Sequence, residues 1–124
     1  MINNAMFVGR LVSDPIVQDT GKGNVSNITI AVPRSYKNEE GIYETDFIDC
    51  TLWKSIAENT AEYCKKGDII GIRGRVETDM VERDGEKKKI TSVIAEKVSF
   101  LSSSRNRSQE QNISKEDDFD EIGR

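Results

Sequence analysis

The strongest constraint on the fold is the alternation of side chains along residues 45–53, where apolar residues occupy every second position. Successive side chains of a β-strand point to opposite faces, so this pattern predicts a strand with one buried face. We expect Ile48, Cys50 and Leu52 to enter a core. The opposite face, which we expect to contact water, carries Phe47, Asp49, Thr51 and Trp53.

The composition also favours strands over helices. Ile, Val and Thr together supply 30 of the 124 residues, whereas Leu and Ala supply 8. Side chains branched at Cβ have a stiff χ1 angle that suits an extended backbone better than a helix. A chain of this length is enough for one domain with a modest core. The sequence therefore predicts a single, mostly β domain.

The order of the expected elements indicates the kind of barrel. We expect a helix over residues 55–66, an Asp84-Gly85 hairpin turn, and strands over residues 3–12, 25–34, 45–53, 68–82 and 87–101. A helix between the third and fourth strands of a five-stranded Greek-key barrel is the arrangement of the OB-fold. That all-β fold binds oligonucleotides or oligosaccharides on one sheet face and its loops.

Local signals add detail to these elements. Ser55 and Glu58 have the spacing of a capping box at the helix start. Gly67 can close the helix with a positive φ angle.

A glycine inside the first strand, Gly9, predicts a bulge or a close backbone approach. Pro33 lacks an N–H and is expected at a strand end or a sheet edge. Residues 16–17 could extend the first strand.

The character of the chain changes after residue 101. Residues 102–112 contain no apolar side chain, which predicts a flexible linker. Five of the six residues 116–121 are acidic. We therefore divide the chain into a domain over residues 1–102 and a disordered acidic tail over residues 103–124. Of the net charge of −4, half belongs to residues 102–124. The negative net charge of the whole chain argues against a nucleic-acid partner, so the positions of the charged residues along the chain must decide.

Several classes of protein are disfavoured by missing residues and motifs. The chain has no His, no phosphate-binding loop and no nucleophile elbow, so we expect no enzyme, metal site or cofactor. No run approaches the roughly 20 apolar residues of a membrane span, and the start does not resemble a signal peptide. Two cysteines are too few for a disulfide scaffold and predict reduced thiols in the cytoplasm.

The aromatic residues on the expected wet face of residues 45–53 need an explanation. Phe47 and Trp53 lie six residues apart, about 20 Å along a strand. If the faces were inverted, both rings would belong to the core, but Asp49 would then be buried at a cost. The sharper interpretation is a platform on which nucleic-acid bases stack. Tyr36 is a third candidate, although an ordinary tyrosine of a hairpin arm is equally compatible with its surroundings.

Six cations lie among these aromatics along the chain. Each one alone is most often a solvated surface charge, but interleaved with aromatics they fit a groove that follows a phosphate backbone. Acidic residues near position 80 dilute this signal. The candidate phosphate contacts are Arg10, Arg34, Lys37, Lys54, Arg73 and Arg75.

An ordered set of short motifs over residues 3–101 resembles the bacterial or phage-encoded single-stranded DNA-binding proteins. The resemblance implies an OB-fold homotetramer, associated with the nucleoid, that wraps single-stranded DNA in replication, recombination and repair. It implies base stacking at Tyr36, Phe47 and Trp53. The motifs include Asn3, Val8-Gly9-Arg10-Leu11, Asn27-Ile28-Thr29-Ile30, Asp46-Phe47-Ile48, Leu52-Trp53, Lys66-Gly67, Arg73-Gly74-Arg75 and Phe100-Leu101.

The resemblance also implies that an acidic tip docks replication and repair proteins. The residues in that place are Asp117, Asp118, Phe119, Asp120, Glu121 and Ile122. This chain departs from the family at two points. Val81 stands where a further stacking aromatic is common, and the chain finishes with Ile122-Gly123-Arg124 where the family usually has Pro-Phe. Phe119 could substitute as the anchor.

Two other hypotheses follow from the residues. The first is an OB-fold interaction module, such as a primosome or phage accessory protein, whose outward aromatics contact protein. The salt dependence of binding discriminates this module from a DNA-binding protein, because DNA binding weakens steeply as the salt concentration rises. The second is that the acidic tail competes with DNA for the basic groove.

Overall fold

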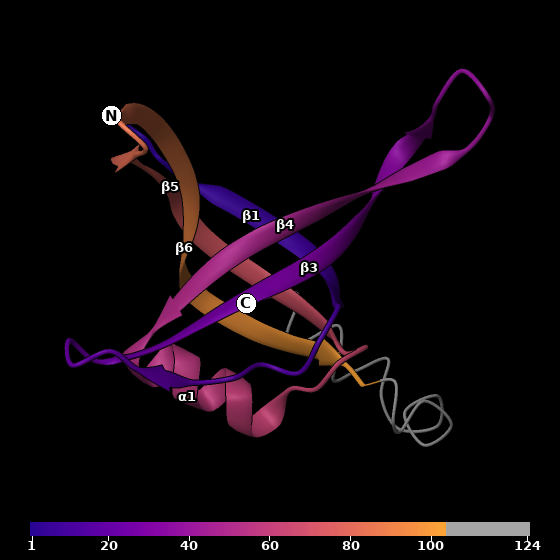
Figure 1. The fold of residues 1–124 in the computed structure, drawn as a ribbon. Helices are drawn as coiled ribbons and strands as arrows, with labels where there is room; N and C mark the ends of the chain where they lie inside the picture. The colour runs from indigo at the N-terminus through magenta and orange to yellow at the C-terminus, as the bar shows by residue number, and fades with distance from the viewer. Residues whose placement is uncertain (104–124) are drawn as a thin grey trace.

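Five long strands close a barrel in a computed structural model of the chain, which describes residues 1–103 (Figure 1). A short strand and one helix complete the fold. The elements are β1 (Ala5–Leu11), β2 (Gln18–Asp19), β3 (Asn24–Lys37), β4 (Tyr43–Trp53), α1 (Lys54–Tyr63), β5 (Ile69–Arg83) and β6 (Glu86–Ser102). The helix lies between the third and fourth long strands, as the sequence predicts, and it is too short and polar to cross a membrane.

The strand order is that of a closed barrel. The sheet runs β1-β5-β6-β4-β3-β2, and β1 also pairs with β3, which joins the two ends. The β4–β6 pairing is parallel, while the other pairings are antiparallel. The predicted five-stranded Greek-key barrel of the OB-fold is therefore confirmed.

The core fills the barrel from alternate positions of its strands. Ile30, Leu52 and Ile70 are fully buried, and Cys50 joins them from β4. The helix lies across one end of the barrel, where its Ala57 is buried against the same cluster (Figure 1). The predicted inward face of β4 is thus confirmed at its buried positions. One face of β4 therefore packs in the core and the other faces solvent.

Gly9 marks the place where the barrel closes. A Cβ atom at Gly9 would lie 2.7 Å from the carbonyl oxygen of Ala31, closer than a side chain allows. Arg10 in β1 pairs with Ala31 in β3 at the same point. The predicted close backbone approach is therefore confirmed, and it exists because two strands must meet there.

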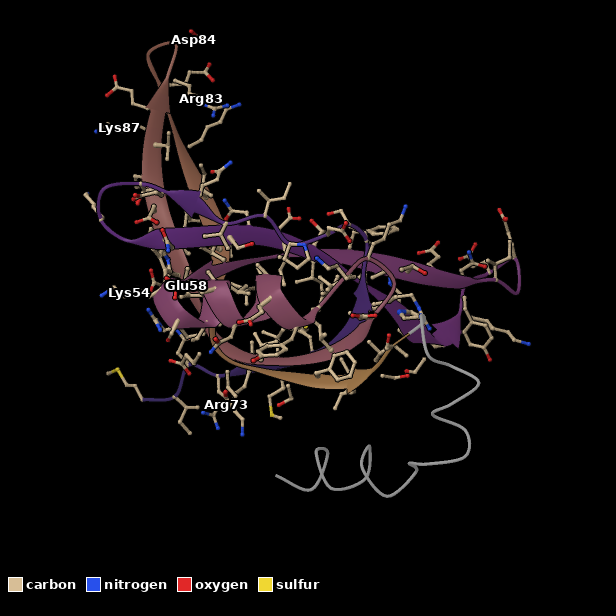
Figure 2. All side chains as sticks on the ribbon, turned by 90° about the horizontal axis from the view of Figure 1, so that it is seen from below. Lys54, Glu58, Arg73, Arg83, Asp84 and Lys87 are labelled. Carbon is tan, nitrogen blue, oxygen red and sulfur yellow. The ribbon has the colours of Figure 1, made fainter. Side chains whose placement is uncertain are left out.

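Two hairpin arms project from the barrel (Figures 1 and 2). In the β5–β6 arm, Arg83 pairs with Glu86 across Asp84 and Gly85, which both have positive φ angles. That two-residue turn matches the predicted hairpin turn. Elsewhere, the ladder between β5 and β6 skips one residue of β6 near Glu96 and another near Leu101.

Two sequence-based details differ from the structure. Residues 16–17 do not extend β1, which ends at Leu11; the chain turns at residues 12–13, and the next strand is β2 on the edge of β3. Val17 instead packs against the core from outside a strand. Strand β3 continues past Pro33 to Lys37, but its regular ladder with β4 ends at Pro33. Pro33 is therefore the last residue of the regular ladder, opposite Thr45, and not the end of the strand.

The predicted capping box is wrong. The helix begins at Lys54, so Trp53 in an extended conformation is the N-cap and no side chain caps the first turn. Ser55 therefore lies inside that turn, and the carboxylate of Glu58 accepts a hydrogen bond of 2.7 Å from the amide of Asn24. The helix also ends at Tyr63 rather than at residue 66. Gly67 has the predicted positive φ angle, but it does not close the helix, whose C-cap is Cys64.

Candidate nucleic-acid interface

The two aromatic rings of β4 lie on its outward face. Phe47 is 66% exposed and Trp53 37%, whereas Cys50 and Leu52 between them are buried. The alternative that inverted the faces of the strand is therefore wrong. Since the rings are separated by six residues, two flat apolar surfaces stand at the two ends of one strand face. Their role in binding stays a prediction.

Polar side chains fill the space between the two rings. Thr29 in β3 pairs with Asp49 in β4, and its hydroxyl donates a hydrogen bond of 2.6 Å to Oδ1 of that carboxylate. One step along, the Thr51 hydroxyl donates to Oδ1 of Asn27 at 3.2 Å. We call this surface the β3–β4 platform: Asn27, Thr29, Phe47, Asp49, Thr51 and Trp53.

Sequence reasoning placed Asp49 on this face but did not assign it, its β3 partners or Thr51 to the site. The signal that could have found them is the cross-strand register, because paired residues on one face interact. That register follows from the pairing of Val25 with Trp53 and of Ala31 with Phe47. A single sequence does not reveal it before the strands are aligned.

Tyr36 lies on the β3–β4 arm, beyond the regular ladder that holds the platform. Its ring is exposed, and the guanidinium of Arg34 stands 6.0 Å from the ring centroid. Across the arm, the ammonium of Lys37 stands 5.6 Å from the ring of Tyr43. Tyr43 was missed by the sequence reasoning, although both members of this pair are exposed cross-strand neighbours. The arm therefore carries its own aromatic surface.

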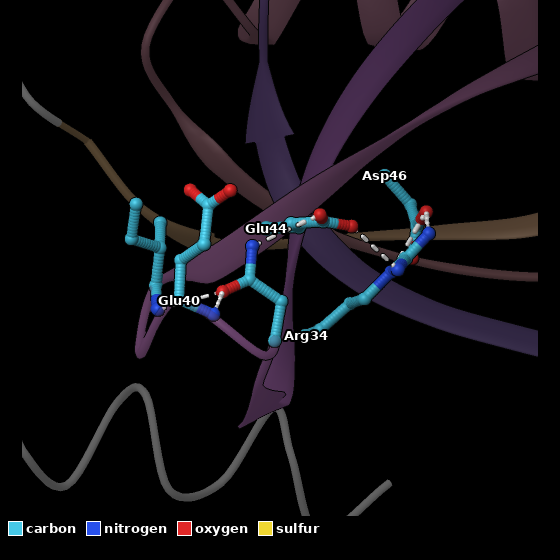
Figure 3. A network of polar contacts seen from close by, with 6 residues as sticks. Arg34, Glu40, Glu44 and Asp46 are labelled. Atoms are coloured by element: carbon cyan, nitrogen blue, oxygen red, sulfur yellow. Dashed lines mark hydrogen bonds and ion pairs between the residues drawn. The ribbon is translucent and has the colours of Figure 1, made fainter.

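Arg34 is tied into the arm by two carboxylates (Figure 3). Its Nη1 lies 2.7 Å from Glu44, and its Nη2 lies 2.9 Å from Asp46. The hydrogen bond and charge of Asp46 raise the pKa of Arg34 further above its usual high value. In return, the hydrogen bond from Arg34 lowers the pKa of Asp46. This predicted phosphate contact thus already has anionic partners.

The same network extends to the tip of the arm. The amide of Asn38 donates to Glu44 at 3.1 Å, and its Oδ1 accepts the backbone N–H groups of Glu40 and Ile42 (Figure 3). The contacts of Arg34 with Glu44 and Asp46 lie in the stretch where the ladder is irregular, between Pro33 and Lys37, and those of Asn38 lie beyond it at the tip. Side chains therefore hold the arm together where backbone pairing is interrupted.

Arg75 resembles Arg34 in its surroundings. Its Nε lies 2.7 Å from Glu77 and its Nη1 lies 3.2 Å from Glu96. Hydrogen bonds to these carboxylates, Glu77 first, raise its pKa. A phosphate approaching Arg75 has to compete with both.

Three of the other predicted cations, Arg10, Lys54 and Arg73, form no ion pairs with carboxylates among the described residues. Arg10 donates instead to the backbone carbonyl of Gly67 at 2.7 Å. Lys54 and Arg73 make no ion pair within residues 1–103, and both point away from the barrel (Figure 2). Lys54 follows Trp53 directly and has a φ angle of 56°, which is uncommon for a residue with a side chain. The predicted tail site, Asp117 to Ile122, lies outside the described residues.

The sequence matches the model of the single-strand binding protein family over residues 2–101. It is 45% identical over 103 residues to "Single-stranded DNA-binding protein B" of Bacillus subtilis, covering 82% of this chain and 91% of that protein. It is 44% identical over 108 residues to "Single-stranded DNA-binding protein 3" of Listeria innocua, covering 86% and 68%. With "Single-stranded DNA-binding protein 1" of Lactococcus lactis the identity is 43% over 112 residues, covering 89% and 75%.

Proposed function

The chain belongs to the single-strand binding protein family, and from that premise we propose that it binds single-stranded DNA without catalysing a reaction. The observation that carries the proposal is the β3–β4 platform. Phe47 and Trp53 expose two rings on a strand face that is otherwise polar. An exposed ring offers stacking worth about 1–3 kcal/mol per base, and it accepts every base because each has a π-face.

Phosphate neutralisation completes the proposed site. Lys54 and Arg73 supply charges without ion-pair partners among the described residues, and Arg10 and Lys37 supply two more. Arg34 and Arg75 contribute only by exchanging carboxylate partners for phosphate, so their share is smaller. Tyr36 adds a stacking surface on the arm. Binding of this kind weakens as salt rises, because each phosphate contact releases counterions.

Fluorescence provides the direct test, because Trp53 is the single tryptophan of the chain. Titration with oligo(dT) at low salt should quench it, as the base stacks on the ring. The matched control is Tyr63→Ala, which removes an exposed ring from the helix rather than the platform. No quench together with no mobility shift contradicts the proposal. Binding that resists high salt points to an aromatic surface for protein instead.

We place this activity in DNA replication, recombination and repair, where single strands need protection, and in the cytoplasm in association with the nucleoid. Residues 1–102 act as the DNA-binding domain in this proposal. Residues 103–124 act as a linker and acidic tail.

We further propose a homotetramer. Met6 and Val8 expose apolar side chains on β1, away from the β3–β4 platform, and an apolar surface of this kind is typical of a contact between chains. Light scattering should give about four times the 14.0 kDa of one chain. Met6→Lys with Val8→Lys should lower that mass, and an unchanged mass rules out this face.

The acidic tail is proposed to recruit replication and repair proteins through Asp117, Asp118, Phe119, Asp120, Glu121 and Ile122. Without a partner, the same charges compete with DNA for the cations. Deleting residues 103–124 should therefore tighten DNA binding at low salt and abolish partner binding. If affinity is unchanged, the competition is absent.

A further inference from the structure

The centre of the β3–β4 platform is occupied by a carboxylate. Asp49 is exposed, and it lies two residues from Phe47 on the same outward face of β4. Side chains at that spacing stand about 7 Å apart along a strand. The edge of a base stacked on Phe47 therefore falls within reach of Asp49. A negative charge is an unexpected neighbour for a polyanion, so its presence requires an explanation.

The Asp49 carboxylate is held in a defined position. The Thr29 hydroxyl donates to Oδ1 at 2.6 Å, from the residue directly across the strand pair. The charge is not compensated, since Asp49 forms no ion pair with any residue in the described part of the chain. Oδ2 stays available toward solvent, next to the place that the stacked base occupies. The platform thus presents an oriented acceptor and no donor at this point.

A carboxylate distinguishes bases by the hydrogen-bond donors on their edges. Cytosine offers its N4 amino group, and carboxylates accept from that group in protein–DNA complexes. Thymine and uracil place a carbonyl oxygen, O4, at the corresponding position, and this oxygen repels the carboxylate. Stacking on Phe47 does not make this distinction, because stacking tolerates every base.

We propose that Asp49 gives the platform a base preference, favouring cytosine over thymine and uracil. This inference rests on the proposed function, because it assumes that a base stacks on Phe47. Thr29 acts as a positioning residue that orients the carboxylate. The charge of Asp49 reduces affinity for every strand by repelling phosphate, while the hydrogen bond to the N4 amino group restores part of that loss for cytosine but not for thymine or uracil.

The test compares oligo(dC) with oligo(dU) of equal length, which differ at the pairing edge but not in a methyl group. We expect the preference for dC, measured as the ratio of the two dissociation constants, to fall about fivefold in Asp49→Asn. Asparagine keeps the size and the acceptor for Thr29 but also donates to the carbonyl of uracil. Thr29→Val, which frees the carboxylate, should lower the same ratio by a smaller factor.

The matched control is Glu62→Gln, which removes the same charge from the exposed helix surface and should leave the ratio unchanged. If Asp49→Asn strengthens binding of dC and dU by the same factor, Asp49 only repels phosphate and the inference is overturned. If wild-type protein binds neither oligonucleotide and Trp53 fluorescence does not respond, the proposed function itself fails.

Discussion

The two faces of β4 differ in burial although they belong to one strand. On the inner face, Leu52 is 0% exposed and Cys50 1% exposed. On the outer face, Phe47 and Asp49 are exposed one residue away from buried or half-buried neighbours. Because a strand alternates its side chains, the inner residues contribute to the free energy of folding, and we propose that the outer ones contribute to the free energy of binding. The following predictions test how cleanly the two are separated.

The largest effect is expected inside the barrel. Leu52→Ala should lower the free energy of unfolding by about 2–5 kcal/mol, because it removes buried methyl groups and leaves a cavity. Urea denaturation followed by circular dichroism measures this. The control is Thr51→Ala, on the outer face next to it, which removes one exposed hydrogen bond and should cost about 1 kcal/mol or less. Equal losses in the two variants contradict the separation of the faces.

The next effect is expected in DNA affinity. Phe47→Ala should weaken binding of oligo(dT) by about 1–3 kcal/mol, the value of one stacked base. The unfolding midpoint should hardly move, since the ring is mostly exposed. Fluorescence anisotropy of a labelled oligonucleotide gives the dissociation constant, with Tyr63→Ala as the control. An unchanged constant means that the outer face is not the binding surface.

The pH dependence of stability at alkaline pH tests the inner face without truncating a buried side chain. Burial, followed by the charge of Asp49, raises the pKa of Cys50 to about 11 from 9.0. The unfolded thiol ionises first, so stability is fully present below pH 9 and decreases as the pH rises toward 11. The expected loss is on the order of 2–3 kcal/mol. Cys50→Ala should lack this component, and parallel pH profiles for the two proteins contradict it.

The smallest effect concerns paired and unpaired cations around the outer face. Arg73→Gln should reduce the slope of log affinity against log salt by about 0.7, the value for one phosphate of a single strand. Arg34→Gln should change the slope less, because Glu44 and Asp46 already compensate its charge. Titrations at several salt concentrations measure both slopes. A larger change for Arg34 means that it exchanges these carboxylates for phosphate in the complex.

Features set by neighbouring residues were predictable from the sequence. The alternation at residues 47–53 identified the faces of β4, and Asp84-Gly85 identified the turn, because both depend on local backbone preferences. Gly9 was informative for a related reason. A missing side chain in a strand indicates that something lies close, even when the neighbour is unknown.

Features set by cross-strand partners were not predictable. The sequence did not reveal that Asp46 pairs with Arg34, because this contact depends on the register of β3 and β4. The role of Arg34 as a phosphate contact stays a prediction. Ser55 had the spacing of a capping box, but β4 runs directly into α1, so the helix starts two residues earlier than a cap at Ser55 would allow. The sequence also did not show that Thr29 lies across from Asp49 and donates a hydrogen bond to its carboxylate. For Arg34 and Asp49 the deciding contact joins two strands whose alignment a single sequence does not specify. For Ser55 the deciding feature is the direct junction of β4 with α1.

The pairing of β1 with both β3 and β5 has a consequence for how the chain folds. Its partners in β5, Ile69 to Gly74, lie far along the sequence, whereas each hairpin forms from neighbouring segments. Ordering such distant contacts slows folding toward milliseconds to seconds in barrels of this kind. During synthesis β1 leaves the ribosome first, yet its β5 partner emerges only after the helix. We therefore expect the first strand translated to be the last one docked.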